Sequence, residues 1–186
     1  MEKILRDRRV YELLEKVDRE LALKAQAGRC EHCGGALHRG DYARKPRGGP
    51  AWDKRYSLCC SRKGCRKRKR PPSVRFLGRK VYVGVVVVLV SAMMQGLSEG
   101  RVKRLRQALE IDRRTLGHWR EWWMRTFARG VFWRAERGRF RPPVIEERMP
   151  LGLVEAFGAW QREGLVNLMK FLSPIMTSPC RGVLAM

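Results

Sequence analysis

The sequence predicts a mostly helical chain that carries one small cysteine-bearing β unit, which places it in the α+β class. Three observations lead to this prediction. Apolar residues recur at helical spacing near both ends, residues 81–94 carry no charge, and residues 29–70 are irregular and rich in Gly, Pro, Cys and basic side chains. The chain has 186 residues, 44% of them hydrophobic, which is enough for one or two small domains.

Residues 3–27 have the pattern of an amphipathic helix, and Gly28 is a natural stop for it. Its apolar positions follow helical spacing, with charges between them: Val10, Leu14, Val17, Leu21 and Ala25. We therefore expect residues 1–28 to form a helix that packs on the next module or on another chain.

Basic side chains dominate the composition. Lys and Arg number 41 against 18 Asp and Glu, a net charge of +23. The excess is concentrated in residues 29–80, which hold 17 basic and 3 acidic side chains. A chain this basic attracts polyanions through counterion release, so nucleic acid is the expected partner. Residues 1–10 lack the apolar stretch of a signal peptide, and we expect a cytoplasmic, nucleoid-associated protein in a reducing setting.

Two groups of cysteines predict a metal site. Cys30-Glu-His-Cys33-Gly-Gly is followed by Cys59-Cys60-Ser-Arg-Lys-Gly-Cys65. Two such turns joined by a longer loop suit a tetrahedral Zn²⁺ site, with each turn offering two thiolates. Such a site is closed to substrate water, so the metal would be structural.

The second turn leaves a choice, because adjacent residues of an extended segment point to opposite sides. We expect Cys60 rather than Cys59 to face the metal, which makes the ligand set Cys30, Cys33, Cys60 and Cys65. His32 and His38 are weaker alternatives. Cys180 is expected to be a free thiol. Residues 29–75 are thus predicted to form a zinc ribbon that depends on its metal, since they have little apolar core.

A basic run surrounds the last cysteine of this unit. Seven of the nine residues from 62 to 70 are basic. On a rigid turn they would form a phosphate-binding edge, whereas as a bare run they could be a targeting or solvated segment. We favour phosphate contact by Arg62, Lys63, Arg66, Lys67, Arg68, Lys69 and Arg70.

The uncharged residues 81–94 predict a buried helix. The run is long for a strand and short for a membrane span, which needs roughly 17 to 25 apolar residues. A helix that is apolar on all sides is a buried one.

Residues 76–130 predict a helix-turn-helix unit of three helices. After the buried helix, Ser98 begins a second one, and Asp112 begins a third that runs to about residue 129. Leu116, Trp119 and Trp123 would hold the third helix on the other two. Its exposed face would meet DNA through Arg113, Arg114, Thr115, His118 and Arg120. The alternative is an ordinary helical bundle with a basic surface.

Residues 131–150 are predicted to be a basic linker that ends in prolines, and residues 151–186 a C-terminal helix or helix pair with a tail. The first and last helices are candidate surfaces for a protein partner, either a transposase or a second copy.

These motifs resemble the zinc ribbon and helix-turn-helix of bacterial insertion-sequence transposases. The resemblance covers residues 30–123 and rests on five segments: Cys30-x-x-Cys33-Gly-Gly; Leu37-His-Arg-Gly-Asp-Tyr; Arg55-Tyr56 leading into Cys60-x4-Cys65-Arg66; Pro71-Pro-Ser-Val-Arg-Phe-Leu-Gly; and Arg114-Thr115-Leu116-x-x-Trp119. It implies recognition of mobile-element ends. Such transposases use three spaced carboxylates to hold two metal ions, but here no Asp follows Asp112, and about 60 further residues cannot house that catalytic domain.

We therefore expect a zinc-dependent, non-catalytic protein that binds double-stranded DNA in preference to RNA, as a transposon-related accessory factor or regulator. No membrane and no small-molecule substrate are expected. The alternative is a structural RNA-binding protein of a ribonucleoprotein complex, in which Trp52, Tyr56 and Trp122 could stack on unpaired bases.

Overall fold

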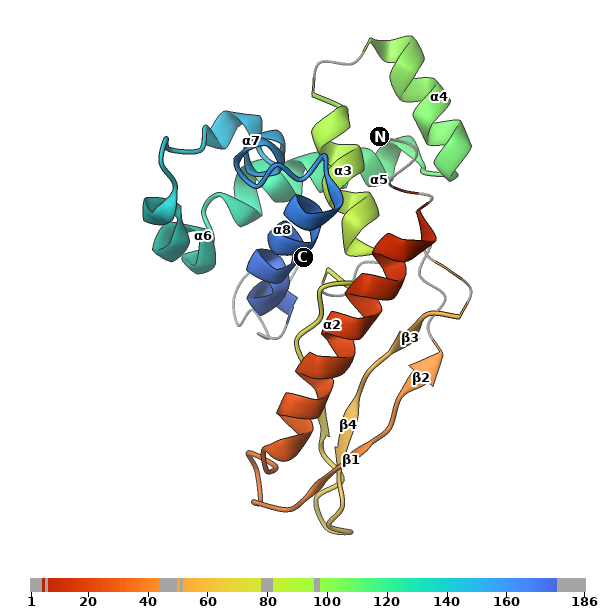
Figure 1. Ribbon diagram of the computed structural model, residues 1–186, viewed down its shortest axis with the longest axis vertical. Coiled ribbons are helices and arrows are strands. Elements are labelled where there is room, and N and C mark those ends of the chain that lie inside the picture. The colour runs from red at the N-terminus through yellow and green to blue at the C-terminus, as the bar shows by residue number, and fades with distance from the viewer. Residues whose placement is uncertain are drawn as a thin grey trace.

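The computed structural model describes residues 5, 7–43, 50, 52–77, 82–95 and 98–176. Most helices gather at one end of the molecule, while the strands run beside the long helix α2 toward the other end (Figure 1). The helices are α2 (Arg8–Ala27), α3 (Gly84–Met93), α4 (Glu99–Leu109), α5 (Arg113–Glu121), α6 (Val131–Glu136), α7 (Leu151–Ala156) and α8 (Arg162–Leu172). The strands are β1 (Leu37–Arg39), β2 (Tyr42–Ala43), β3 (Lys54–Arg55), β4 (Leu58–Cys60) and β5 (Arg68–Lys69).

Helix α2 is the expected amphipathic helix. It begins after Asp7, whose carboxylate accepts a hydrogen bond from the Arg9 N–H at 2.9 Å, and it ends at Gly28. Val10 and Leu14 on its apolar face are fully buried. The helix packs against β1 on one side and against α8 on the other. It therefore joins the strand-bearing part of the chain to the helical part.

The strands form two small antiparallel sheets. One has the order β1-β4-β5, and its register places Leu37 opposite Cys60; the other pairs β2 with β3. The Gln26 amide donates to the Leu37 carbonyl at 3.4 Å, which ties the end of α2 to β1. The structure confirms the secondary structure predicted from the sequence, mostly helices with one small β unit.

Helix α3 confirms the prediction of a buried helix, since all ten of its residues are buried. It packs against α5, α7 and α8, so each of its sides meets an apolar neighbour. This surrounding explains why a valine-rich run forms a helix, because packing overrides the weak helical propensity of valine. No helix in the described part of the chain is long and apolar enough to cross a membrane.

Helices α4 and α5 follow as predicted, with Ser98 and Asp112 at their N-cap positions. Glu110 between them has a left-handed backbone (φ 51°), which turns the chain within three residues. Beyond Glu121 the helix continues as a π-helix over Trp122–Phe127. The apolar face is the predicted one: Leu116, Trp119, Trp123 and Phe127 are all buried.

Residues 131–150, expected to be a basic linker, are instead part of the helical core. They contain α6 and two 3-10 turns, Arg137–Arg139 and Glu146–Arg148. Trp133 and Met149 are each only 1% exposed, and the Trp133 indole N–H donates to Glu146 at 2.8 Å. The basic residues there are exposed on the outer surface, which is why the composition resembles that of a linker.

The C-terminal helix pair is confirmed, and its glycines mark the turn. Gly158 ends α7 with a left-handed backbone (φ 57°). At Gly164 a Cβ would overlap the carbonyl oxygens of Phe157 and Gly158, so no larger residue fits. Residues of α2, α3, α5, α7 and α8 share one apolar core. The apolar faces of α2 and α8 therefore pack within the chain itself.

Candidate metal centre and basic surfaces

Four cysteine sulfurs come together where the two cysteine turns meet. The Sγ atoms of Cys30, Cys33, Cys60 and Cys65 all lie within 4.8 Å of one another. Cys30 and Cys65 are 3.8 Å apart, and Cys33 and Cys60 are 3.4 Å apart. A tetrahedral ion with metal–sulfur bonds of about 2.3 Å needs sulfurs about 3.8 Å apart. The donor set therefore fits one metal ion of the kind that thiolates prefer, zinc or iron.

The two turns hold their cysteines in similar ways. In the first turn, residues 30–35, the Gly34 N–H donates to the Cys30 carbonyl at 2.8 Å. In the second turn, residues 60–67, the Arg66 N–H donates to the Arg62 carbonyl at 3.1 Å. Gly34 and Arg66 each follow the last cysteine of their turn, and both have positive φ, 67° and 45°. The same backbone bend thus closes both turns.

The second glycine of the first turn is needed for space. A Cβ on Gly35 would lie 3.0 Å from the Cys60 sulfur and 3.0 Å from Arg62 Cγ. Such contacts are tighter than side chains accept without a shift. The two glycines after Cys33 are therefore required for different reasons. Gly34 allows the positive φ of the turn, and Gly35 leaves room for the second turn to approach closely.

The structure selects Cys60 over Cys59. Cys60 is buried in the cluster, whereas the Cys59 thiol points to the backbone carbonyls of Cys60 and Arg66 at 3.7 and 3.6 Å. His32 and His38 are exposed and do not belong to the cluster. Cys180 lies outside the described residues.

The thiols interact electrostatically. A backbone N–H of Gly35 and the neighbouring Cys60 thiol lower the pKa of Cys33 to about 7. At Cys60 a hydrogen bond from the backbone of Arg62 acts in the same direction, but burial and the neighbouring thiols outweigh it and raise its pKa to about 12. A cation at the centre would favour thiolates at all four positions.

Apolar packing around the cluster is slight. Its core consists of Cys30, Leu37, Leu58 and Cys60, with Ala25, Cys33 and Cys65 partly buried beside it. A core of two leucines cannot order a unit of this size. This supports the expectation that the cysteine turns depend on a bound metal.

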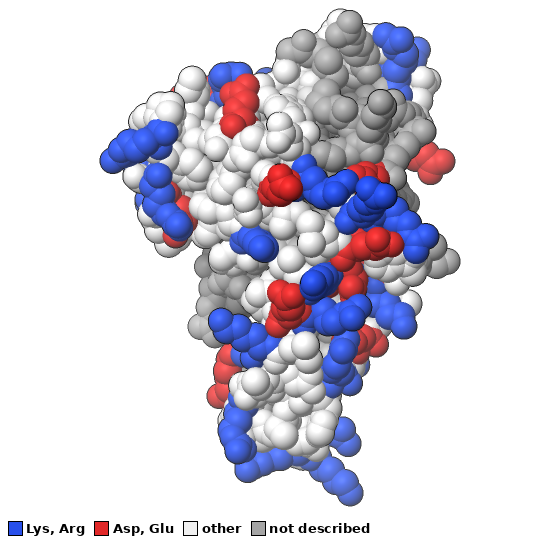
Figure 2. All heavy atoms as spheres, in the orientation of Figure 1, with Lys and Arg blue, Asp and Glu red and all other residues white. Residues whose placement is uncertain are grey.

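Basic side chains surround the end of the molecule that holds the cysteine turns (Figure 2). Figure 2 shows Lys and Arg side chains around that end, whereas acidic and basic residues alternate along α2. Of the seven basic residues from 62 to 70, all but Lys69 are exposed. Lys69 forms an ion pair with Glu31, and within the described residues no other member of this group is paired. The group is free to meet an external polyanion.

The exposed face of α5 is a second basic surface. Arg113, Arg114, His118 and Arg120 are exposed, and Thr115 is half-buried. No ion pair in the described ranges engages the three arginines. Trp119 is buried on the opposite side and meets Tyr82 edge-on at 5.1 Å, so the helix is fixed by its apolar side.

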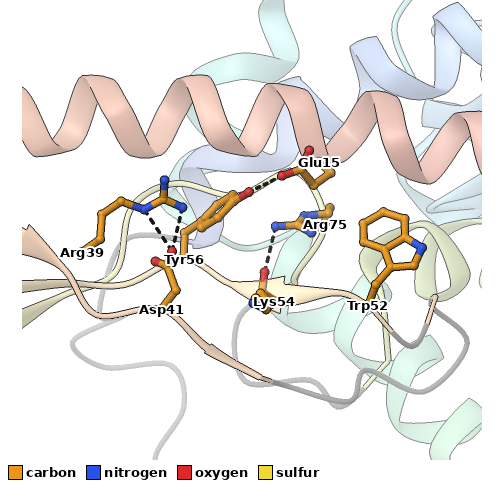
Figure 3. Close-up of a pocket in the computed structure, with 7 residues that line it drawn as sticks. All are labelled: Glu15, Arg39, Asp41, Trp52, Lys54, Tyr56 and Arg75. Carbon is orange, nitrogen blue, oxygen red and sulfur yellow. Dashed lines mark hydrogen bonds and ion pairs between the residues drawn. The ribbon is translucent and has the colours of Figure 1, made fainter.

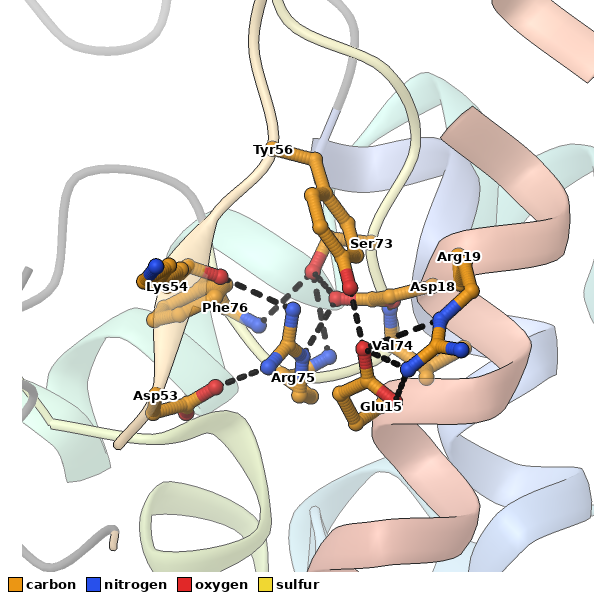
Figure 4. Close-up of polar contacts among 10 residues, drawn as sticks. All are labelled: Glu15, Asp18, Arg19, Asp53, Lys54, Tyr56, Ser73, Val74, Arg75 and Phe76. Atoms are coloured by element: carbon orange, nitrogen blue, oxygen red, sulfur yellow. Dashed lines mark hydrogen bonds and ion pairs between the residues drawn. The ribbon is translucent and has the colours of Figure 1, made fainter. Parts of the chain in front are cut away.

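Sequence reasoning missed a buried ionic network between α2 and the strands, shown in Figure 4. The Arg75 guanidinium is 1% exposed; its Nε donates to Asp18 at 2.8 Å, its Nη2 to the Lys54 carbonyl at 2.9 Å, and its Nη1 to Asp53. Asp18 also accepts from the Ser73 hydroxyl at 2.6 Å and the Val74 N–H at 2.5 Å. Three distant segments therefore meet at one guanidinium.

Burying this network costs electrostatic energy, and the position of Asp18 in the sequence indicates that such a network exists. Burial raises the pKa of Asp18, although Arg75 and the hydrogen bonds to Ser73 and Val74 oppose this effect. Asp18 lies four residues after Leu14 and four before Ala22, on the apolar face of α2. An acid in that position needs a buried cation, and this was the clue to Arg75.

The three aromatic residues proposed to stack on bases differ in the structure. Trp122 is half-buried and contacts Trp123 at 4.6 Å, and the Tyr56 ring lies between the Arg39 and Arg75 guanidiniums at 4.9 and 5.2 Å. Trp52 is 43% exposed. Of the three, Trp52 has the ring most open to a ligand.

Comparisons with protein-family models, with curated proteins and with solved structures found no match to this chain.

Proposed function

We propose that this chain is a non-catalytic, zinc-dependent protein that binds duplex DNA. The observation that carries the proposal is a set of two exposed basic surfaces whose arginines form no ion pair with another described residue. One lies on the second cysteine turn and the other on α5. With a net charge of +23, such surfaces favour a polyanion over a small substrate.

Zinc held by the four cysteines would act as a structural cross-link between the two turns. The turns would then present the six exposed basic residues of the 62–70 segment to phosphates. Contacts of this kind add affinity that is independent of sequence and falls with salt.

Helix α5 would read bases in the major groove, as the second helix of a helix-turn-helix does. Arg113 and Arg114 open the helix, where such motifs meet base edges, and His118 lies about one turn further on. Arginine can contact guanine with two hydrogen bonds, which gives sequence preference. The three-residue turn before α5 and its buried apolar face support this assignment.

The arrangement of carboxylates supports a non-catalytic role. Glu121, Glu136, Glu146 and Glu155 each pair with an arginine on the surface. In the described ranges the cysteine cluster is the group of metal-ligating side chains that comes together. By its resemblance to insertion-sequence transposases, the protein is proposed to be an accessory factor or regulator of a mobile element, acting in the cytoplasm at the nucleoid.

The test is a selection from random duplex DNA at near-physiological salt, with structured RNA as competitor. We expect a defined duplex motif to be enriched. Arg113→Ala with Arg114→Ala should abolish the preference for that motif, at a cost of about 1–3 kcal/mol for each arginine that reads a base, and leave non-specific affinity nearly unchanged.

Two further variants separate the surfaces. Arg62→Ala with Lys63→Ala should weaken binding to all sequences equally and reduce the salt slope, by about one unit for each phosphate that the variant no longer neutralises. Arg137→Ala, which removes an exposed arginine that belongs to neither basic surface, is the control. Equal affinity for all duplexes in the native protein would refute base reading.

The exposed Trp52 favours a second candidate, a structural RNA-binding protein. The same selection decides between the two. Retention on the structured RNA, with no duplex motif enriched, would replace the DNA proposal with this one.

A further inference from the structure

A pocket of about 190 Å³ lies between α2 and the strands, away from the cysteine cluster and from α5. Figure 3 shows it beneath α2, with Trp52 at one end, Arg39 and Asp41 at the other, and Tyr56, Lys54, Arg75 and Glu15 between them. It mixes an exposed aromatic ring with charged groups of both signs. Nothing in the proposed mode of DNA binding uses it.

Most of its polar groups already have partners within the chain. Arg39 donates to the Asp41 carboxylate through Nε at 3.0 Å and Nη2 at 2.6 Å. The Tyr56 hydroxyl donates to Glu15, and Arg75 belongs to the buried network. Glu15 also forms an ion pair with Arg19 at 2.9 Å. Each carboxylate of the pocket is therefore paired with an arginine of the chain, and neither is available for a cationic ligand.

Two groups remain available, the Trp52 indole and the Lys54 ammonium. Both residues are exposed, and no hydrogen bond or ion pair joins either side chain to another described residue. Trp52 offers an aromatic face for stacking and an indole N–H that donates a hydrogen bond, and Lys54 offers a cation that also donates. The complementary ligand is planar, rich in acceptors and anionic, and a nucleotide has all three properties.

The backbone between these two residues is fixed. Asp53 is 2% exposed and pairs with Arg75, while the Lys54 carbonyl accepts from the same guanidinium at 2.9 Å. Asp53 thus points inward while the residues on either side of it line the pocket. A ring held by an anchored backbone loses little freedom when a ligand stacks on it.

We propose that this pocket takes one nucleotide, with its base against Trp52 and its phosphate at Lys54. The inference rests on the proposed binding of nucleic acid and adds a subsite to it: an unpaired nucleotide at a bulge or an end of the duplex. A free mononucleotide has the same chemistry, so the experiment must distinguish the two sources.

The experiment compares a blunt duplex, the same duplex with one bulged nucleotide, and adenosine monophosphate, each titrated into the native, zinc-loaded protein. Fluorescence anisotropy of labelled DNA and ligand-observed NMR for the mononucleotide give the affinities. Base–aromatic stacking predicts about tenfold tighter binding of the bulged duplex. Trp52→Ala and Lys54→Ala should each remove most of that advantage and leave affinity for the blunt duplex unchanged.

Trp160→Ala, which removes an exposed tryptophan from the turn between α7 and α8, is the control and should retain the advantage. Adenosine monophosphate binding that Trp52→Ala abolishes, without a bulge preference, would support the pocket with a free nucleotide as its source. Equal affinity for both duplexes together with no mononucleotide binding would overturn the inference. Binding of the blunt duplex is measured independently, so failure of the pocket and failure of the proposed function give different results.

Discussion

Replacing Arg75 by methionine tests the buried network most directly. The change removes the cation that faces Asp18 and Asp53, whose side chains are 2% and 1% exposed. Removing one partner of a buried ion pair costs about 3–5 kcal/mol, a large fraction of the 5–15 kcal/mol that stabilises most domains. For a chain of this length, about 2–4 °C per kcal/mol predicts a melting temperature lower by roughly 6–20 °C.

The loss should depend on pH. Burial raises the pKa of Asp18, and Arg75 opposes this effect, so without Arg75 that pKa rises further in the folded state. The variant therefore gains stability relative to the native protein as pH falls toward 4 and Asp18 becomes protonated. Circular dichroism melts between pH 4 and 8 would measure this. Arg125→Met, which removes an exposed pair with Glu121, is the control and should cost less than about 0.5 kcal/mol. A melting temperature within 2 °C of the native value at pH 7 would refute the assigned role of Arg75.

Two further predictions use matched pairs of residues. Cys59→Ser should keep one equivalent of tightly bound metal by mass spectrometry, whereas Cys60→Ser should lose it and make the cysteine turns sensitive to protease; loss in both would contradict the ligand set. Gly117→Ala should raise the free energy of unfolding by up to about 1 kcal/mol, because Gly117 is exposed in the middle of α5 with open space around it. Gly164→Ala should lower it by more than about 1 kcal/mol, because the new methyl group would clash with two backbone carbonyls. Denaturant melts measure both changes. The opposite order would mean that the packing of α7 and α8 is misassigned.

The sequence predicted well those elements whose signal is local. The spacing of apolar residues predicts helices α2 and α3, and the residue types at the helix starts predict the N-cap positions Ser98 and Asp112. The alternation of side chains along a strand predicts that Cys60 rather than Cys59 joins the cluster. These features depend on a few neighbouring residues. The structure therefore reproduces them.

What the sequence did not reveal depends on contacts between distant segments. Arg75 meets Asp18 and Asp53, 57 and 22 residues away, and one basic residue among many carries no mark of burial. Residues 131–150 have the composition of a linker because their basic side chains are numerous and exposed. Trp133 and Met149 reach the core only because the chain folds back toward α3 and α7.

Helix α2 runs from the cysteine turns toward the end of the molecule where α5 lies, so its length bears on how one duplex could meet both basic surfaces. The first cysteine turn follows the C-terminal end of α2, and α4 and α5 lie toward its other end (Figure 1). The helix has 20 residues and so spans on the order of 30 Å. One turn of DNA is about 34–36 Å long, so a single duplex is long enough to meet both basic surfaces in neighbouring grooves. The small core around the cysteines cannot set that separation. We therefore expect the separation to depend on a metal held by the four cysteines at one end of the strands and on Arg75 at the other. Loss of either should therefore reduce DNA affinity before it changes sequence preference, because base reading is proposed to reside in α5 alone.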